Sequence, residues 1–330
     1  MAAPQDTRGI VDPVTLLTRV HFRRHLPAPP LRPYIDRYWL IDWNLPTPYT
    51  SRVIPHPAVN ITFQWDEDEG APYAELTGIP RGLYTRTLTG RGRVCGVKFR
   101  PGAIRAFAPG VAAGRWTGRA LPLDEAMEEA GRGPAPEAAR TAAVRSTAHP
   151  EAPRDAARTS APSRRCAEPQ EAPRNAAQTP PRQAPRNPLA RLLPALDLTA
   201  PGDDAARVAA LDAHFLALPL TPDPQIPLAT RLVAEIRANR ELRRVSDVAD
   251  AAGLSPRSLQ RLFATHVGVT PKWTILRYRL HEALDEATHT PTPDWPTLAA
   301  DLGYADQSHL IRAFTKTLGV PPEAYVQALA

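Results

Sequence analysis

The chain has 330 residues with 6% aromatic residues and 39 prolines, so it is long enough for two domains but parts of it cannot form a packed core. The formal net charge of +6 indicates an anionic partner, yet residues 130–200 hold 11 Lys and Arg against 6 Asp and Glu, whereas residues 227–330 hold 12 against 11. Two cysteines, Cys95 and Cys166, exclude a disulfide framework and lack metal-binding spacing, and no apolar run is long enough to span a membrane.

The first ordered unit is predicted at residues 20–125, after a disordered tail at residues 1–19. Residues 31–41 place apolar side chains at helical spacing and predict a helix. Several short runs bounded by Gly and Pro have strand character, and residues 59–65 alternate apolar and polar side chains as a half-buried strand does. We therefore predict an α+β domain, a small antiparallel barrel or sandwich with a packing helix. The expected strands are residues 53–54, 59–65, 74–78, 83–88 and 93–99.

Aromatic residues of this unit either line a ligand cavity or form ordinary core. Barrel-like domains bind ligands in cavities with apolar and aromatic walls and a few fixed polar groups. His56 is flanked by two prolines, which would hold it in an extended loop at a pocket mouth. A small neutral or weakly anionic ligand is expected between Tyr38 and Phe99, if one binds. The candidate effector pocket comprises Tyr38, Trp39, His56, Phe63 and Phe99.

Residues 126–188 are rich in Pro, Ala and Arg and nearly free of large apolar side chains. The nine residues that begin at Glu151 recur, with few changes, from Glu171. Such a segment cannot bury enough surface to offset its ordering entropy, so we predict a disordered linker. Its arginines would contact nucleic acid without sequence preference or serve no binding role. Residues 189–226, where leucines return at helical spacing, predict a helical connector.

Residues 227–330 contain nearly the same pattern twice. Leu259–Phe263, followed by a Gly-Val-x-Pro stop, returns 51 residues later as Leu310–Phe314 with its own stop. Each copy follows an apolar helix pattern with a small alanine and, four residues on, a glycine. A small residue allows two helices to cross closely, and glycine takes the left-handed turn, so we predict an all-α tandem helix-turn-helix domain. The packing residues are Ala249, Gly253, Leu259, Phe263, Ala299, Gly303, Leu310 and Phe314.

Polar side chains on the outward faces of the second helices are the expected DNA contacts. Ser246 or Asp247 is predicted to cap the first helix, and Ser255 and Asp306 the two recognition helices. Arg matches guanine and Gln matches adenine in the major groove. For His309, a solvated surface position is the alternative to a DNA contact. The candidate DNA-binding residues are Arg257, Ser258, Gln260, Arg261, Gln307, Ser308, His309, Arg312 and Lys316.

These motifs carry a family resemblance. Residues 232–330 resemble the DNA-binding domain of AraC-type transcriptional regulators, most specifically in Leu254–Phe263 and Leu302–Phe314. The resemblance implies seven helices with two helix-turn-helix units whose outward residues face successive grooves. Residues 23–123 are more loosely similar to a sensor domain found ahead of such regulators, and this likeness indicates no ligand.

We therefore expect a sequence-specific transcription regulator that reads two successive major-groove segments and is controlled through its N-terminal domain. The alternatives are a DNA-repair or other enzyme that uses Cys95 as a nucleophile, fused to a DNA-binding module, and an architectural protein without sequence preference. Expected partners are double-stranded DNA, RNA polymerase and a small-molecule effector, with no cofactor, metal or membrane. Monomer and homodimer both stay open. Without a signal peptide, the protein is expected in the cytoplasm.

Overall fold

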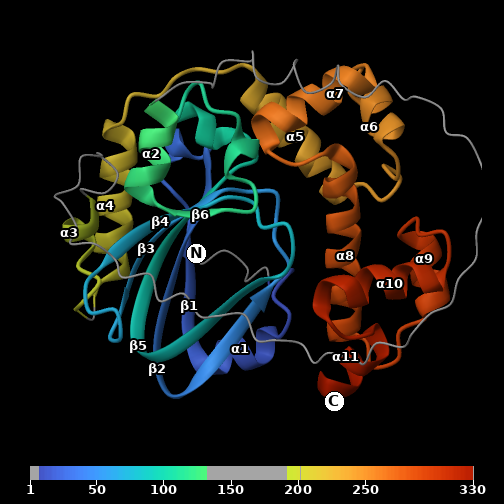
Figure 1. Ribbon diagram of the computed structural model, residues 1–330, viewed down its shortest axis with the longest axis horizontal. Helices are drawn as coiled ribbons and strands as arrows, with labels where there is room; N and C mark the ends of the chain where they lie inside the picture. Colours follow the sequence, from blue (N-terminus) through green and yellow to red (C-terminus); the bar gives the residue numbers. More distant parts are fainter. Residues whose placement is uncertain (1–6, 132–191, 201, 330) are drawn as a thin grey trace, which may run out of the picture. The chain divides into compact units, whose positions relative to one another are not determined.

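The computed structural model describes residues 7–131, 192–200 and 202–329 (Figure 1). Its N-terminal part is built on a six-stranded sheet in the order β1-β2-β5-β3-β4-β6, in which every neighbouring pair is antiparallel. The antiparallel α+β architecture predicted from the sequence is therefore confirmed. The strands are β1 (Val20–His25), β2 (Ile35–Val53), β3 (Asn60–Asp66), β4 (Tyr73–Thr77), β5 (Tyr84–Phe99) and β6 (Ala120–Pro122).

Strand β5 joins two runs that the sequence predicted as separate strands. Gly92 and Gly96 lie within it, paired with Trp43 and Trp39 of β2. A Cβ at Gly92 would lie 2.1 Å from the Trp43 ring, and one at Gly96 1.9 Å from the Trp39 ring. Glycine is therefore required at these two positions because an indole ring packs directly on each of them on one face of the sheet, and neither glycine forms a turn.

The helix predicted at residues 31–41 is wrong. A 3₁₀ turn at Pro29–Leu31 leads instead into the 19-residue strand β2. The pairing of β2 with β5 shifts between Ile35 and Arg37, and the shift brings Ile35 and Tyr38 to the same buried side. A β-bulge of this kind changes the two-residue alternation into a three-residue spacing, which resembles the period of a helix.

One face of the sheet packs against helices that follow the last strand in the chain. Phe215 meets Phe99 edge-on, with ring centroids 5.9 Å apart, and the Tyr38 hydroxyl donates to Asp212 at 2.9 Å. The segment predicted as a connector thus completes the N-terminal core, because its leucines and Phe215 cover an apolar sheet face. These helices are α2 (Leu123–Gly131), α3 (Leu193–Leu196) and α4 (Asp204–Ala217), beside the 3₁₀ turns Ala103–Ala106 and Ala113–Trp116.

Two predicted boundaries also differ from the structure. Within the expected N-terminal tail, Val11 is buried and Asp12 caps helix α1 (Pro13–Arg19), accepting from the Thr15 amide at 2.9 Å. Apolar contacts therefore order residues whose local sequence looked polar. At the other end, α2 extends six residues into the range expected to be linker, because Ala126 packs into the core. The remainder of the predicted linker, residues 132–188, lies outside the described residues.

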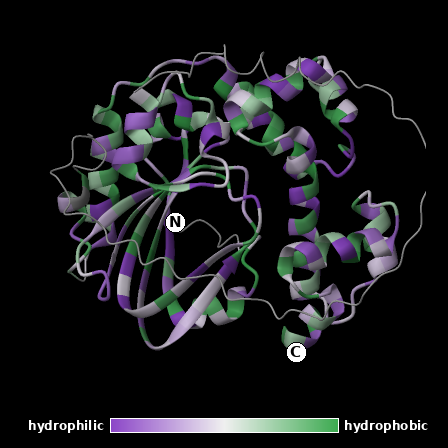
Figure 2. Cartoon of the chain, viewed as in Figure 1, coloured by the Kyte–Doolittle hydropathy of each residue, from purple (hydrophilic) through white to green (hydrophobic). Residues whose placement is uncertain are grey.

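The C-terminal part of the described chain is entirely helical, as predicted. Hydrophobic and hydrophilic residues are interleaved along each helix (Figure 2). None of the helices described is long and apolar enough to cross a membrane. The helices are α5 (Gln225–Ala238), α6 (Val245–Ala251), α7 (Pro256–Leu262), α8 (Pro271–His289), α9 (Trp295–Asp301), α10 (Gln307–Leu318) and α11 (Pro322–Leu329), with a π-helical segment at Phe263–Val267.

Candidate nucleic-acid interface and sheet cavity

Helices α6 and α7 form the first helix-turn-helix unit. Gly253 takes the left-handed conformation with φ +62°, and the turn is closed by amide bonds from Gly253 to Asp250 and from Leu254 to Ala249. Ala249 is fully buried where the helices cross. Leu259 and Phe263 are fully buried on the inner side of the second helix. A larger residue than alanine would separate the helices, and a β-carbon at Gly253 would strain the turn.

Helices α9 and α10 repeat this geometry. Gly303 has φ +73°, and its amide donates to Ala300 at 3.0 Å while the amide of Tyr304 donates to Ala299 at 2.9 Å. Leu310 and Phe314 are fully buried beneath α10. The two units therefore close their turns with the same pair of hydrogen bonds, although the second has one more residue between the glycine and the anchoring leucine.

Side-chain caps fix where each recognition helix begins. The Ser255 hydroxyl accepts from the amide of Ser258 at 3.1 Å, and Asp306 accepts from the amide of His309 at 2.7 Å. Helix α6 differs from expectation, because it begins at Val245, before the residues predicted to cap it. Asp247 lies in its first turn and accepts from the amide of Arg244 at 2.7 Å, so this carboxylate caps from the third helical position.

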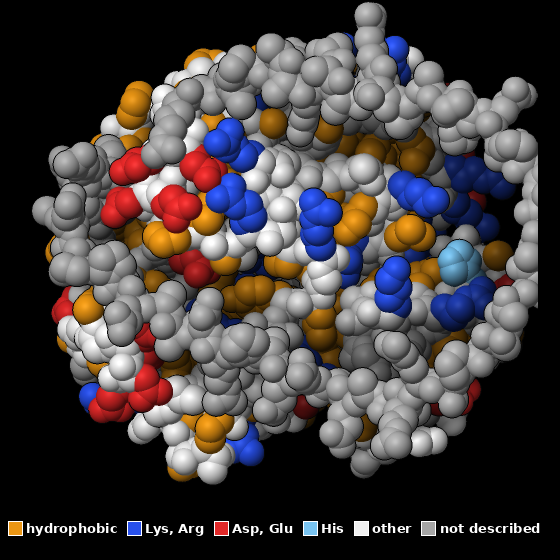
Figure 3. Space-filling model, in the orientation of Figure 1, with side chains coloured by type: hydrophobic (Ala, Val, Ile, Leu, Met, Phe, Trp, Pro, Cys, Tyr) orange, Lys and Arg blue, Asp and Glu red, His pale blue; other side chains and the backbone are white. Residues whose placement is uncertain are grey.

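The candidate DNA-binding residues lie on the outer faces of α7 and α10. Ser258 and Gln307 are half-buried, and the other seven are exposed. Among the described residues, Arg257, Arg261 and Arg312 form no ion pair, so no acidic neighbour competes for them. Lys and Arg side chains gather over the C-terminal helices on the face shown in Figure 3. The His309 ring stands edge-on against Tyr304 at 5.2 Å, which restrains its orientation.

Helix α8 joins the two units and contains buried cations that sequence reasoning missed. The Arg279 guanidinium donates to the carbonyl of Asn239 at 3.0 Å and pairs with Glu282 at 2.9 Å. Arg277 stacks over Trp273 and donates to the carbonyl of Arg81 at 3.0 Å. These side chains hold α8 to the end of α5 and to the N-terminal domain. Their spacing in the helix is the signal: Arg277 falls on the stripe of the buried Leu280, and Arg279 falls on the stripe of the buried Ile275 and Ala283.

A pair of histidines joins α8 to the loop between β2 and β3. The rings of His56 and His281 have centroids 4.4 Å apart. His281 Nε2 lies 3.3 Å from the carbonyl of Pro55, and His56 Nε2 lies 3.3 Å from that of Arg8. A carbonyl only accepts, so both rings carry a proton on Nε2. Burial lowers the pKa of His281 to about 3 and that of His56 well below its usual value, so both are neutral near pH 7.

Further contacts link the first unit to the N-terminal domain at the backbone of Gly268 and through Ile79, which belongs to the apolar cluster of that unit. The Thr117 hydroxyl donates to the carbonyl of Gly268 at 2.7 Å, and a Cβ at Gly268 would lie 3.0–3.1 Å from the backbone of Ala113 and Gly114. The second unit is linked through side chains. The Tyr325 hydroxyl donates to the carbonyl of Val11, and Ile54 belongs to the apolar cluster that includes α8 and α10.

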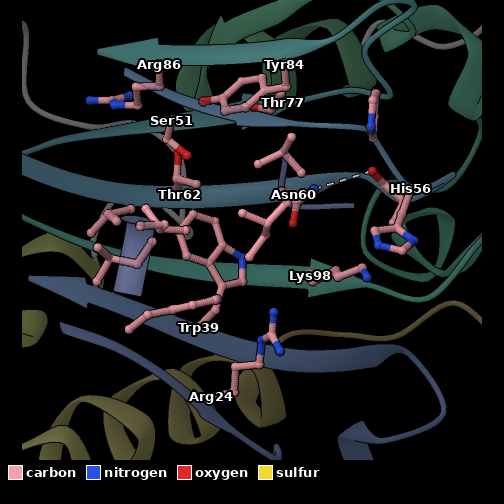
Figure 4. Close-up of a pocket in the computed structure, with 18 of the residues that line it drawn as sticks. Arg24, Trp39, Ser51, His56, Asn60, Thr62, Thr77, Tyr84, Arg86 and Lys98 are labelled. Carbon is pink, nitrogen blue, oxygen red and sulfur yellow. Dashed lines mark hydrogen bonds between the residues drawn. The ribbon is translucent and has the colours of Figure 1, made fainter. Parts of the chain in front are cut away.

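The sheet face away from the packed helices lines a cavity of about 240 Å³. Of the five predicted pocket residues, Trp39 and His56 line it (Figure 4). Tyr38, Phe63 and Phe99 do not, because they are fully buried in the core on the opposite face. Adjacent residues on a strand point to opposite faces, so Tyr38 and Trp39 cannot share one pocket. The prediction that all five residues line one pocket is therefore wrong.

The cavity also carries more charge than predicted. Its lining includes Arg24, Arg37, Arg86 and Lys98 but no acidic residue. Lys98 Nζ lies 3.5 Å from Asp36, yet burial outweighs this attraction and lowers the pKa of Lys98 to about 8. The sequence signal was the alternation along β5, which sets Lys98 on the face opposite to Phe99.

The cysteine proposed as a nucleophile is placed unfavourably for that chemistry. Cys95 is fully buried in the sheet core, and burial raises the pKa of its thiol to about 12. The thiolate, which is the reactive form, is therefore scarce at neutral pH. Nowhere in the described ranges do three His, Cys, Asp or Glu side chains gather to hold a metal ion.

Comparisons with known proteins agree with this geometry. Residues 248–328 match a family model described as a helix-turn-helix domain, and residues 23–122 match a domain of unknown function, DUF6597. No curated protein matches the chain.

Similar solved structures include an AraC-type transcriptional regulator from Chromobacterium violaceum, 24% identical over 31% of this chain and 90% of that one, with a TM-score of 0.28. The C-terminal domain of the response regulator AraT from Geobacillus stearothermophilus is 23% identical over 32% and 86%, with a TM-score of 0.29. ToxT from Vibrio cholerae is 9% identical over 94% and 99%, with a TM-score of 0.38. The chain therefore contains a helix-turn-helix domain at residues 248–328, which follows a domain of unknown function at residues 23–122.

Proposed function

We propose that the chain reads two successive major-groove segments of a specific DNA site, one with α7 and one with α10. The observation that carries this proposal is the repetition of one turn geometry, with a side-chain cap and an exposed polar face on each recognition helix. Residues at the N-terminal end of such a helix enter the groove. The candidate base-reading residues are Arg257, Gln260 and Arg261 on α7, and Gln307, Ser308, His309 and Arg312 on α10; Lys316 and Ser258 contact phosphate.

The test is the substitution Arg261→Ala, measured on a DNA site selected by the purified full chain and on random DNA at one salt concentration. Loss of a bidentate base contact weakens specific binding by about 1–3 kcal/mol and relaxes preference at one position. Arg231→Ala, a surface arginine on α5 whose nearest acidic partner is Glu235, is the matched control and leaves both affinities unchanged. An equal loss on selected and random DNA would make Arg261 a phosphate contact instead.

We also propose that the N-terminal domain controls DNA binding. The support is the set of contacts between that domain and α8, which joins both recognition units. His56 both lines the sheet cavity and stacks on His281 of α8. A ligand alters DNA affinity only through a difference in its interaction with two arrangements of the protein. A ligand at the edge of the cavity near His56 would contact the residue that stacks on His281 of α8.

A further inference from the structure

The sheet cavity has an apolar region with flat walls. The indole of Trp39 lies over Gly96, and that of Trp43 lies over Gly92. Because cross-strand partners share a face, the next positions along are Ile41 and Val94, which are also paired. Trp43 is buried, whereas Trp39 is only half-buried and keeps part of its indole at the cavity. An aromatic ring stacks against such an indole with ring centroids about 4.5–7 Å apart.

The cavity has a cationic region at its other end. Arg37, Lys98 and Asn60 are cross-strand partners on β2, β5 and β3 and form one polar row across the sheet. Figure 4 shows Lys98 and Asn60 on the same side as His56, with Trp39 between them and the rest of the cavity. Arg24 of β1, paired with Trp39, adds a further positive charge beside this row.

The carboxylate of Asp36 is shared by two of these cations, Arg37 and Lys98. Asp36 lies 3.0 Å from Arg37 and 3.5 Å from Lys98, while the cavity lining itself holds no acidic residue. The row therefore keeps a positive excess in a place where water is partly excluded. Buried charge is costly unless it is paired, so an incoming anion gains more here than at an exposed lysine.

We propose that this cavity binds an aromatic monocarboxylate, with its ring against the Trp39 indole and its carboxylate at Lys98 and Asn60. The inference rests on the proposed regulatory role of the N-terminal domain and gives the chemical class of its effector. A cavity of about 240 Å³ exceeds the ~150 Å³ apolar cavity that holds benzene, and the difference accommodates a short acid side chain. The carboxylate then lies next to His56, which contacts α8.

The experiment titrates the full-length protein, without DNA, with phenylacetate, phenylacetamide and hexanoate, by calorimetry and by tryptophan fluorescence. Phenylacetamide has the same ring without the charge, and hexanoate has the charge without the ring. We expect phenylacetate to bind at one site per chain and to change the fluorescence. Loss of one charge-assisted contact should weaken phenylacetamide about 10-fold to 100-fold. Hexanoate should also bind more weakly than phenylacetate because it cannot stack.

Two variants locate the site. Lys98→Met should abolish the preference for phenylacetate over phenylacetamide, whereas Lys98→Arg should preserve it. Arg91→Gln is the matched control, because Arg91 lies on the same strand, is 60% exposed and is outside the cavity lining. Thermal melting of each variant shows that the fold survives. If Lys98→Met fails to fold, Lys98→Arg together with a fill variant, Val94→Phe, replaces it, and the fill variant should exclude phenylacetate.

The inference is overturned if none of the three probes binds, if phenylacetamide binds as tightly as phenylacetate, or if hexanoate equals phenylacetate. It is also overturned if neither Lys98→Met nor Val94→Phe changes phenylacetate binding. DNA affinity is measured on the same preparations without any probe. Intact specific DNA binding together with any of these results rejects the ligand class alone, whereas loss of sequence preference rejects the proposed function.

Discussion

The two helix-turn-helix units have the same turn geometry, but they contact the N-terminal domain in different ways. Each closes its turn with a left-handed glycine and the same pair of amide bonds. The first unit continues from α7 into a π-helical segment that ends at Gly268, against the backbone of Ala113 and Gly114. The second contacts the same domain through side chains, at Ile54 and Tyr325. The turn geometry is thus repeated, whereas the connection to the N-terminal domain is specific to each unit.

The largest effect is expected where an apolar side chain connects the sheet to α8 and the second unit. Ile54→Ala should lower the free energy of unfolding by about 2–5 kcal/mol, as for other buried isoleucines cut to alanine, and should also change affinity for selected DNA. Ile61→Ala is the matched control, equally buried in the same domain but on the core face away from the C-terminal helices. It should lose similar stability without altering DNA affinity, measured by urea denaturation and gel shift at a permissive temperature.

An equal change in DNA affinity for Ile54→Ala and Ile61→Ala would contradict the claim that Ile54 couples the sheet to α8 and the second helix-turn-helix unit. Both effects would then follow from general loss of stability.

The histidine pair predicts a pH dependence at the same joint. The pKa of His281 is about 3 in the folded protein and near 6.5 when unfolded, so between these values the unfolded chain binds more protons. Stability is therefore complete above about pH 6.5 and falls as the pH falls. From pH 7 to pH 5 the loss attributable to His281 is about 2 kcal/mol. His281→Gln keeps a donor for the Pro55 carbonyl and should remove this part of the loss in urea denaturation.

His289→Gln, at the exposed end of the same helix, is the control and should retain the full pH dependence. A His281→Gln variant that loses as much stability between pH 7 and pH 5 as the parent chain would show that another group titrates.

The smallest expected effect is a difference in thermal stability between alanine variants of Gly268 and Gly319, the glycines that follow the second helix of each unit. Gly268 and Gly319 have φ of +93° and +83°, so alanine at either position costs about 1–2 kcal/mol of backbone strain. Only at Gly268 would the new Cβ also approach backbone, 3.0 Å from Ala113, whereas Gly319 opens to free space. Gly268→Ala should therefore be the more destabilising of the two in thermal melts. Equal melting temperatures would mean that the first unit is not held against the N-terminal domain at this point.

The sequence predicted the helix-turn-helix units well because their determinants are local. Caps, turn glycines and the apolar stripe lie within about twenty residues of one another, as with Ser255 and Leu259. The N-terminal strands were predicted where alternation was regular, as in β3. The prediction of a helix at residues 31–41 was wrong because a bulge near Ile35 changes the spacing of the apolar residues. A bulge depends on the pairing with a distant strand rather than on the local sequence.

The cavity and the joint depend on pairings between distant segments. Trp39 and Lys98 share a face only because β2 pairs with β5 in one register, and no local pattern fixes that register. His281 lies beside Pro55 although 226 positions separate them. The alternation along β2 nevertheless separates Tyr38 from Trp39, whereas placing Phe63 and Phe99 on the face of Tyr38 requires the register of β3 and β5.

The most direct test is guanine methylation interference on the selected site, with the full chain at one molecule per DNA. The account predicts two interfered major-groove segments about one helical turn, ~34 Å, apart. Arg261→Ala should erase interference in one segment and Arg312→Ala in the other. A single segment, or two variants that affect the same segment, would contradict the claim that one chain reads DNA with both recognition helices.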